Sequence, residues 1–147
     1  MSKTLSLHHI VFATAHRFPL IPESHKRDLY SYIFGILKNK KCYVYRINGM
    51  RDHIHILIDL NPSVALADLV RDIKRNSSLW MSENELYPHN SNWGKGYYAV
   101  SLGRDGLDAC IEYIKNQEIH HRGRDFMAEA EDLAAQNGLT WYADDWK

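Results

Sequence analysis

The chain of 147 residues has the size of one domain, and its 45% apolar and 24% charged residues are typical of a globular protein rather than a disordered or fibrous one. No apolar run approaches the roughly 18 residues of a membrane span. The first residues lack the apolar stretch of a signal peptide, so we expect one cytoplasmic domain over residues 1–147. Cys42 and Cys110 are too few for a disulfide framework or a thiolate zinc site, which leaves them as core residues.

Charge is distributed unevenly, although the chain is formally neutral with 18 basic and 18 acidic residues. Residues 1–124 hold 17 Lys and Arg against 12 Asp and Glu, a net charge of +5, whereas residues 125–147 carry a net charge of −5. The local field, rather than the total charge, decides whether a protein attracts a phosphate backbone. The basic part is therefore compatible with nucleic-acid binding. A solvated surface with an acidic last helix is the alternative.

The residue pattern predicts four strands and four helices. In chain order they are a strand over 7–14, a helix over 23–39, strands over 41–48 and 53–60 joined by residues 49–52, a helix over 64–81, a strand over 97–102, and helices over 105–118 and 125–136. The first six elements match the split βαβ order of a ferredoxin-like or RRM-like α+β fold, an antiparallel sheet with helices on one face. A C-terminal helix and tail follow, and Trp141, Tyr142 and Trp146 indicate that the tail packs against the protein.

Two histidines alternate with isoleucines in the strand predicted over 53–60. His53 and His55 are separated by Ile54 and followed by Ile56 and Ile58. Because side chains alternate in a strand, the isoleucines face the helices and the histidines face the other way, about 7 Å apart along the backbone. Two imidazoles at that distance can bind one divalent ion. The alternative is a pair of polar residues on a solvated face of the sheet.

The helix predicted over 105–118 carries a phenol and a carboxamide one turn apart. Tyr113 and Gln117 are spaced i and i+4, at the margin of an apolar stripe that includes Ile111 and Ile114. These two side chains are candidates to meet the histidine pair. An edge-of-core tyrosine beside a surface glutamine is the alternative.

Four segments in order carry a family resemblance. They are His9–Phe12 with Thr14 and Arg17, Asp52–His55, Trp93–Tyr98 followed by Ser101–Gly103, and Glu112–Gln117. Together they resemble the HUH-type single-tyrosine transposases of the smallest bacterial insertion sequences, a family that includes the REP-associated tyrosine transposases. The resemblance covers a core of about residues 5–121, and the acidic segment 122–147 is similar to the tail of the REP-associated or domesticated branch. Ala15–Arg17 departs from the basic-aromatic-arginine run of many members.

The resemblance implies a metal-dependent transposase that needs no ATP. His53, His55 and Gln117 would bind a divalent metal ion, Mg²⁺ or Mn²⁺, and Tyr113 would attack a phosphodiester to give a 5′-phosphotyrosine and a free 3′-OH. The substrate would be single-stranded DNA with hairpin or palindromic ends. The family implies a homodimer in which the tyrosine helix of one chain can complete the active site of the other. No membrane partner is implied.

Basic side chains around these motifs are the candidate nucleic-acid contacts, because a single strand is bound by a basic groove together with base stacking. The candidates are Arg17, Arg46, Arg51, Arg71, Lys74, Arg75, His120, His121 and Arg122, with Arg124 beside them.

Three other functions remain open. An RRM-type module would bind bases through aromatic residues on its central strands, where this chain has His53, His55 and Leu57. A catalytically inactive or domesticated regulator of the same lineage would bind hairpin DNA without cutting it. A metal-dependent phosphodiesterase would use water in place of Tyr113.

Overall fold

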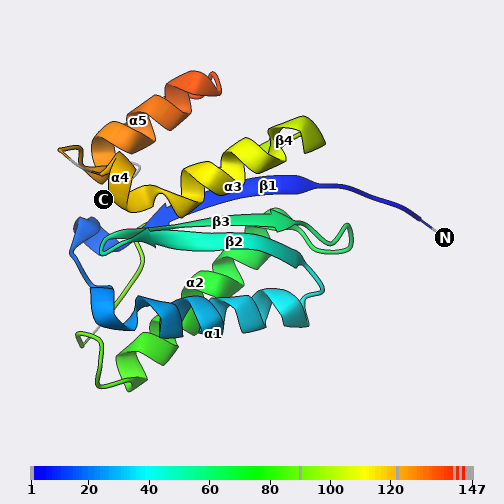
Figure 1. Ribbon diagram of the computed structural model, residues 1–147. Helices are drawn as coiled ribbons and strands as arrows, with labels where there is room; N and C mark the ends of the chain where they lie inside the picture. Colours follow the sequence, from blue (N-terminus) through cyan, green and yellow to red (C-terminus); the bar gives the residue numbers. More distant parts are fainter. Residues whose placement is uncertain (1, 90, 122, 141, 143, 145–147) are drawn as a thin grey trace.

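A four-stranded antiparallel sheet lies between two groups of helices (Figure 1). The computed structural model describes residues 2–89, 91–121, 123–140, 142 and 144. The strands are β1 (Leu7–Ala13), β2 (Tyr43–Met50), β3 (His53–Asp59) and β4 (Tyr98–Leu102). The helices are α1 (Lys26–Asn39), α2 (Leu66–Glu83), α3 (Leu107–Lys115), α4 (Gln117–His120) and α5 (Phe126–Gln136).

The strand order β2-β3-β1-β4, with every neighbouring pair antiparallel, is that of the split βαβ fold. The predicted α+β fold class is therefore confirmed. The turn between β2 and β3 is shorter than predicted, because β2 continues to Met50, which pairs with His53. Gly49 allows this close pairing, since a Cβ atom there would lie only 2.2 Å from the carbonyl oxygen of His53.

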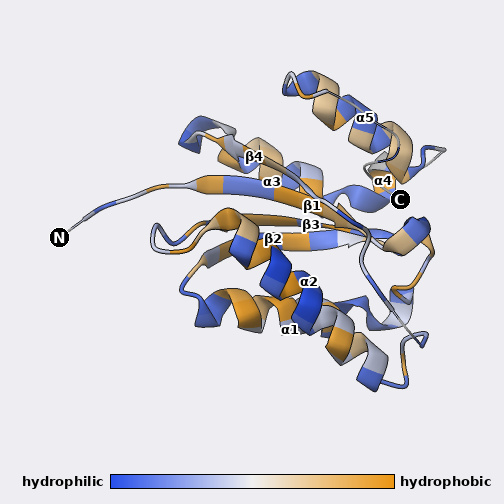
Figure 2. Cartoon of the chain, turned by 180° about the vertical axis from the view of Figure 1, so that it is seen from behind, coloured by the Kyte–Doolittle hydropathy of each residue, from blue (hydrophilic) through white to orange (hydrophobic). Residues whose placement is uncertain are grey.

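One face of the sheet encloses the larger hydrophobic core together with α1 and α2. Ile54, Ile56 and Ile58 of β3 are 0% exposed and belong to the same cluster as Ile33 of α1 and Ile73 of α2. The isoleucine row thus faces these two helices, as its alternation predicts. Figure 2 shows hydrophobic residues along the strands and hydrophilic residues on the outward side of α2.

The opposite face of the sheet is covered by α3, α4 and α5 (Figure 1). Val11 of β1 and Tyr98 of β4 form a second buried cluster with Phe126, Ala130 and Leu133 of α5. The expectation of helices on only one face is wrong, because the chain returns across the sheet after β4. Since bases cannot stack on a covered face, this arrangement also argues against the RRM-type alternative.

The helix predicted over 105–118 is divided in two at Asn116, which has φ −97° and ψ 29°. Asn48 of β2 donates from Nδ2 to the carbonyl oxygens of Ile114 and Lys115, at 3.0 and 3.2 Å. These bonds satisfy carbonyl groups that would otherwise lack partners at the end of α3. The phenol and the carboxamide predicted to share one helical flank therefore lie on two successive helices.

Local capping defines the ends of α5. Asp125 accepts a hydrogen bond from the backbone N–H of Ala128 at 2.9 Å, which begins the helix. Gly138 follows the helix with φ +66°, a left-handed conformation that glycine adopts without strain.

The remaining expectations about the fold have mixed outcomes. Tyr142 is 62% exposed, so it does not pack as predicted, and Trp141 and Trp146 lie outside the described residues. Cys42 is buried and Cys110 is half-buried, and both are free thiols. Among the described residues, no helix combines the length and the apolar character needed to cross a membrane.

Candidate active site

His53 and His55 lie side by side on the face of β3 that α3, α4 and α5 cover. Both side chains are 0% exposed, and their ring centroids are 5.1 Å apart. Their direction follows from strand alternation, because Ile54 between them points into the opposite core. The alternative of polar residues on a solvated sheet face is therefore wrong. Buried imidazoles need partners, and both histidines have them.

Each imidazole is oriented through its Nδ1 atom. Nδ1 of His53 lies 2.8 Å from Oδ1 of Asp52, and Nδ1 of His55 lies 2.9 Å from Nε2 of His9 on β1. Such contacts set the tautomer and the orientation of a ring, and here they direct both Nε2 atoms toward α4 and α5. Burial lowers the pKa of His55 to about 4 and that of His9 to about 3, so both rings are neutral at pH 7.

Glu129 of α5 lies at the centre of the histidines. Its Oε1 atom is 3.2 Å from Nε2 of His53, 3.2 Å from Nε2 of His55 and 2.9 Å from Nε2 of His121. The carboxylate is 4% exposed. Although burial raises its pKa, the hydrogen bonds from the three histidines outweigh burial and lower that pKa far below the usual range. Glu129 is therefore a buried anion.

His53 is the imidazole that balances this anion. Burial lowers the pKa of His53, but its hydrogen bonds with Asp52 and Glu129 have the larger combined effect and raise the pKa to about 9. At pH 7 the site thus combines an imidazolium with a carboxylate. A buried charge of this kind persists only when it is paired and hydrogen-bonded, as both groups are here.

Tyr113 and Gln117 reach the same carboxylate from α3 and α4. The hydroxyl group of Tyr113 donates to Oε2 of Glu129, and Nε2 of Gln117 donates to the same oxygen at 3.1 Å. The other end of the carboxamide, Oε1 of Gln117, lies 3.1 Å from Nε2 of His53. Burial and the adjacent carboxylate raise the pKa of Tyr113 well above its usual value. One chain therefore brings together the phenol, the carboxamide and both histidines.

The arrangement fits a metal ion. The ligand atoms of His53, His55 and Glu129 all lie within 4.8 Å of one another. Two atoms bound at right angles to one ion, each at about 2.1 Å, are separated by about 3 Å. The separations of 3.1 Å from His53 to Gln117 and 3.2 Å from each histidine to Glu129 match this value. His53, His55 and Glu129 thus form a group that can bind a divalent ion.

Glu129 is the residue that the sequence analysis missed. It was counted only within the acidic segment 122–147, but it lies on the same side of α5 as the buried residues Phe126, Ala130 and Leu133. Residues spaced i, i+3 and i+4 share one helical face, so the spacing of Phe126, Glu129 and Ala130 in the sequence already indicates that Glu129 lies on the apolar face of this helix. A carboxylate within an apolar stripe needs a buried partner.

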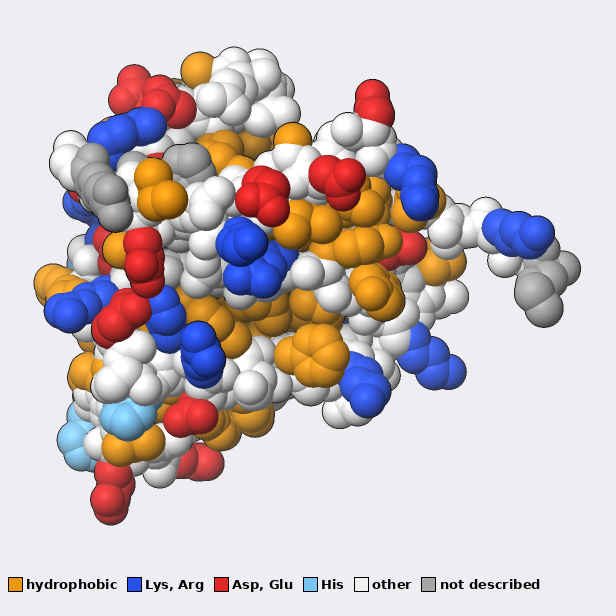
Figure 3. Space-filling view, viewed as in Figure 1, with side chains coloured by type: hydrophobic (Ala, Val, Ile, Leu, Met, Phe, Trp, Pro, Cys, Tyr) orange, Lys and Arg blue, Asp and Glu red, His pale blue; other side chains and the backbone are white. Residues whose placement is uncertain are grey.

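The predicted DNA contacts lie in several different places. Arg17 and Arg51 line a hollow beside the histidine site, together with Arg124. Arg46 is exposed on β2. The three basic residues of α2 are on the other side of the sheet, as Figure 1 shows for the helix itself. On the face shown in Figure 3, basic and acidic side chains are interspersed, and no single basic patch covers that face.

The predicted contacts after Gln117 have different outcomes. The side chain of His121 is 7% exposed and contacts Glu129, which places it in the candidate active site, and its predicted contact with DNA stays a prediction. His120 lies in α4, but its side chain is outside the described part of the structure, as is all of Arg122.

Comparison with known proteins places these features in context. Residues 2–117 match the family of IS200-like transposases. The chain is 27% identical over 115 residues to the transposases of insertion sequence IS200 from Salmonella typhimurium and Salmonella typhi, covering 75% of this chain and 75% of each relative. A solved REP-associated tyrosine transposase bound to a REP hairpin has a TM-score of 0.64 at 12% identity, covering 100% of this chain and 90% of that one. A Deinococcus radiodurans protein thought to be a transposase has a TM-score of 0.61 at 18% identity, covering 80% and 95%.

Proposed function

This chain belongs to the family of IS200-like transposases, and on that basis we propose that it cuts and rejoins single-stranded DNA through Tyr113. The Tyr113 oxygen would attack the phosphorus of a phosphodiester, and the 3′ oxygen would leave as a 3′-OH. The product is a 5′-phosphotyrosine. Because one phosphodiester replaces another, the bond energy is conserved and the step needs no ATP.

The observation that carries this proposal is the convergence of Tyr113, Gln117, His53 and His55 on Glu129 in one buried site. A free tyrosine has a pKa near 10 and is a weak nucleophile at neutral pH. Oε2 of Glu129 accepts the Tyr113 hydroxyl and so positions the phenol beside the histidines, although the very low pKa of Glu129 makes it a weak base for the phenol proton.

We assign Mg²⁺ or Mn²⁺ to the site, bound by His53, His55 and Gln117, with Glu129 as a further ligand. Mixed nitrogen and oxygen donors suit these ions better than a metal that seeks thiolates. When bound, the ion would draw charge from the non-bridging oxygens of the phosphate as a Lewis acid. Asp52 and His9 would hold the two imidazoles in the orientation that binding requires.

The proposed partner is single-stranded DNA with hairpin or palindromic ends, because a relative of the same fold is bound to a REP hairpin. Arg17 and Arg51 line the hollow beside the site, together with Arg124, and would contact phosphates there. We retain a cytoplasmic location as part of the proposal, since the proposed substrate is DNA. We retain a homodimer as a proposal, but Tyr113 reaches the His53 and His55 site of its own chain, so shared active sites are not required.

One observation favours a second function, a regulator that binds hairpin DNA without cutting it. His53, His55 and Gln117 are 0% exposed, and Phe126 of α5 stacks on His53 with ring centroids 4.3 Å apart. DNA can therefore reach the site only if α5 moves. A chain in which α5 stays in place would bind DNA elsewhere and leave it intact.

Covalent adduct formation distinguishes the two functions. The full chain is incubated with Mn²⁺ or Mg²⁺ and single-stranded DNA that carries short hairpins with randomised flanks and a 3′ label. A transposase gives a labelled protein band that survives a denaturing gel, whereas a regulator gives DNA binding without this band. We expect Tyr113→Phe to abolish the band and Tyr43→Phe, a matched change at a tyrosine 64% exposed on β2, to leave it intact. An adduct formed by Tyr113→Phe would remove Tyr113 from the proposal.

A further inference from the structure

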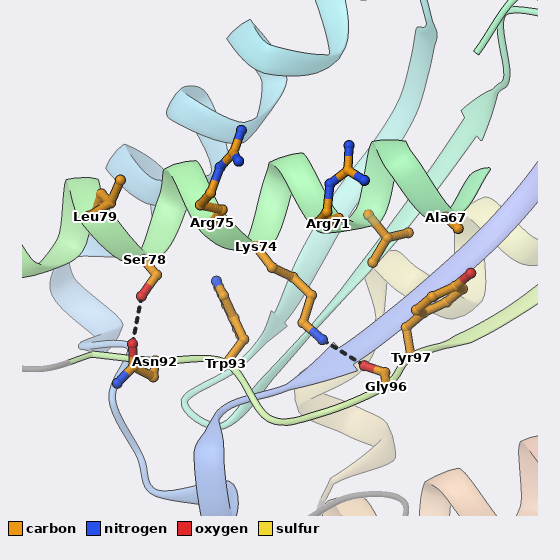
Figure 4. Close-up of a pocket in the computed structure, with 11 residues that line it drawn as sticks. Ala67, Arg71, Lys74, Arg75, Ser78, Leu79, Asn92, Trp93, Gly96 and Tyr97 are labelled. Carbon is orange, nitrogen blue, oxygen red and sulfur yellow. Dashed lines mark hydrogen bonds between the residues drawn. The ribbon is translucent and has the colours of Figure 1, made fainter. Parts of the chain in front are cut away.

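A groove of about 800 Å³ separates α2 from the segment that leads into β4 (Figure 4). Apolar side chains form much of its lining, with Val70 and Leu79 from α2 and Trp93 and Tyr97 from the segment. Nε1 of Trp93 donates to Oγ of Ser77 at 2.8 Å, which fixes the indole against α2. Leu79 is 57% exposed and Tyr97 is 39% exposed, so apolar surface is accessible in the groove.

The described residues that line this groove include three cations and no acid. Lys74 extends across the groove, where its Nζ donates to the carbonyl oxygen of Gly96 at 2.8 Å (Figure 4). Gly96 has φ +73°, a conformation that glycine adopts without strain. Arg71 and Arg75 line the rim from α2, one turn or about 6 Å apart along the helix axis, and Figure 4 shows their guanidinium groups turned away from Trp93 and Tyr97.

The rim arginines can exchange their present partners for an anion. Their side chains are 62% and 65% exposed. Arg71 contacts Asp68 at 3.2 Å and Asp72 at 3.4 Å, and Arg75 contacts Asp72 at 3.5 Å. Exposed ion pairs of this kind contribute little, so a phosphate can replace the carboxylates at low cost. Lys40, which follows α1, also contacts Asp72, at 2.8 Å, so this one carboxylate is shared by three cations.

These features define the chemistry of an occupant. It must combine a flat apolar group, which can stack on Tyr97, with negative charges spaced to meet Arg71 and Arg75. A nucleotide of a single strand has both, since its base stacks on aromatic rings and its phosphates follow at regular intervals. The volume of the groove is within the range of small-ligand sites.

We propose that this groove binds an unpaired nucleotide of single-stranded DNA, with the base against Tyr97 and the phosphates at Arg71 and Arg75. The site lies on the α2 side of the sheet, away from Tyr113, and this proposal rests on the proposed function, which supplies the DNA. Tyr97 also borders a second hollow lined by Lys95 and Ala134, which continues around β4 to α5.

Binding without cleavage tests this site directly. The probe is a fluorescent 20-nucleotide poly-dT, measured by anisotropy with the full chain in EDTA. Arg71→Ser with Arg75→Ser is expected to weaken binding about ten-fold at low salt and to reduce the salt dependence by about 1.4 in log–log slope, as loss of two single-strand phosphate contacts requires. Tyr97→Ala is expected to weaken binding about ten-fold, and Tyr97→Phe to retain it, because the ring is what stacks.

A matched control removes the same charge from α1. Arg27 and Lys38 are exposed there, and Arg27→Ser with Lys38→Ser is expected to change binding less than two-fold. Equal losses in the two double variants, or unchanged binding by Tyr97→Ala, would overturn the proposal. So would an acidic peptide that competes as well as unlabelled poly-dT. A wild-type chain that binds poly-dT in this way but forms no adduct would refute the proposed cutting reaction and support the groove.

Discussion

Replacing Glu129 by Gln removes one charge while keeping nearly the same shape, at the point where five side chains meet. Oε1 of Glu129 faces three imidazoles, and Oε2 accepts hydrogen bonds from Tyr113 and Gln117. A carboxylate can accept at both oxygens, whereas a carboxamide accepts at one end and donates at the other. If the NH₂ group of the new amide takes the place of Oε2, Tyr113 and Gln117 lose their acceptor. If it takes the place of Oε1, the three histidines lose theirs.

The expected loss follows from the number of orphaned groups. A buried donor left without a partner costs about 1–3 kcal/mol, and at least two donors lose their acceptor in Glu129→Gln. The imidazolium of His53 also loses its buried counter-charge, although it can release its proton and limit the penalty. We therefore predict that the free energy of unfolding falls by about 3 kcal/mol at pH 7 in the absence of metal.

Urea unfolding in EDTA measures this loss, with Glu131→Gln as the control. Glu131 lies on the exposed side of the same helix, so its replacement is expected to change stability by less than about 0.5 kcal/mol. Adding Mn²⁺ should stabilise the wild type more than Glu129→Gln, because the variant has lost one ligand. Equal stability of the two variants, or equal stabilisation by Mn²⁺ of variant and wild type, would refute the central position given to Glu129.

Three further predictions follow from the same geometry. In EDTA, the free energy of unfolding should be greatest near pH 6.5. As pH falls from 6.5 to about 4, His55 binds a proton in the unfolded chain but stays neutral in the folded one, so the folded state loses stability. As pH rises from 6.5 to about 9, folded His53 loses its proton and the stabilisation that goes with it. Thermal melts across this range check it, and a monotonic profile would contradict it. Mixing Tyr113→Phe with His53→Ala should restore no adduct, because one chain supplies both groups, and recovery would show that active sites are shared between chains. Gly49→Ala should cost several kcal/mol in urea unfolding, because its Cβ would lie 2.2 Å from a backbone oxygen, whereas Gly35→Ala on α1, with nothing within 4 Å, should be neutral or stabilising.

The elements that sequence reasoning located correctly are those set by local periodicity. Alternation along β3 correctly predicted which residues face α1 and α2: Ile54 packs in that core, whereas His55 contacts Glu129 of α5 on the opposite side. The βαββαβ order also fixed the sheet, because few topologies remain once short antiparallel connections are assigned. Gln117 contacts His53 and Tyr113 lies beside His55, as the motif spacing suggested, although their roles in chemistry stay predictions.

The features that sequence reasoning missed depend on contacts between distant segments. Asn48 of β2 ends α3 by binding its last carbonyl groups, and no local pattern shows that a side chain 66 residues away takes this place. The burial of the histidine face depends on α5 crossing the sheet, which brings Glu129 and His121 into the candidate site. The net charge of residues 125–147 gave no sign that Glu129 is buried, because a sum of charges does not show which carboxylate of α5 points inward.

Identification of the residue that becomes linked to DNA tests the central claim most directly. The full chain is incubated with hairpin-bearing single-stranded DNA and Mn²⁺, and the adduct is digested with protease and nuclease and sequenced by mass spectrometry. We predict a single modified peptide that carries a nucleotide 5′-phosphate on Tyr113. A modification on any other residue, or cut DNA with no nucleotide bound to the protein, would contradict catalysis by this tyrosine.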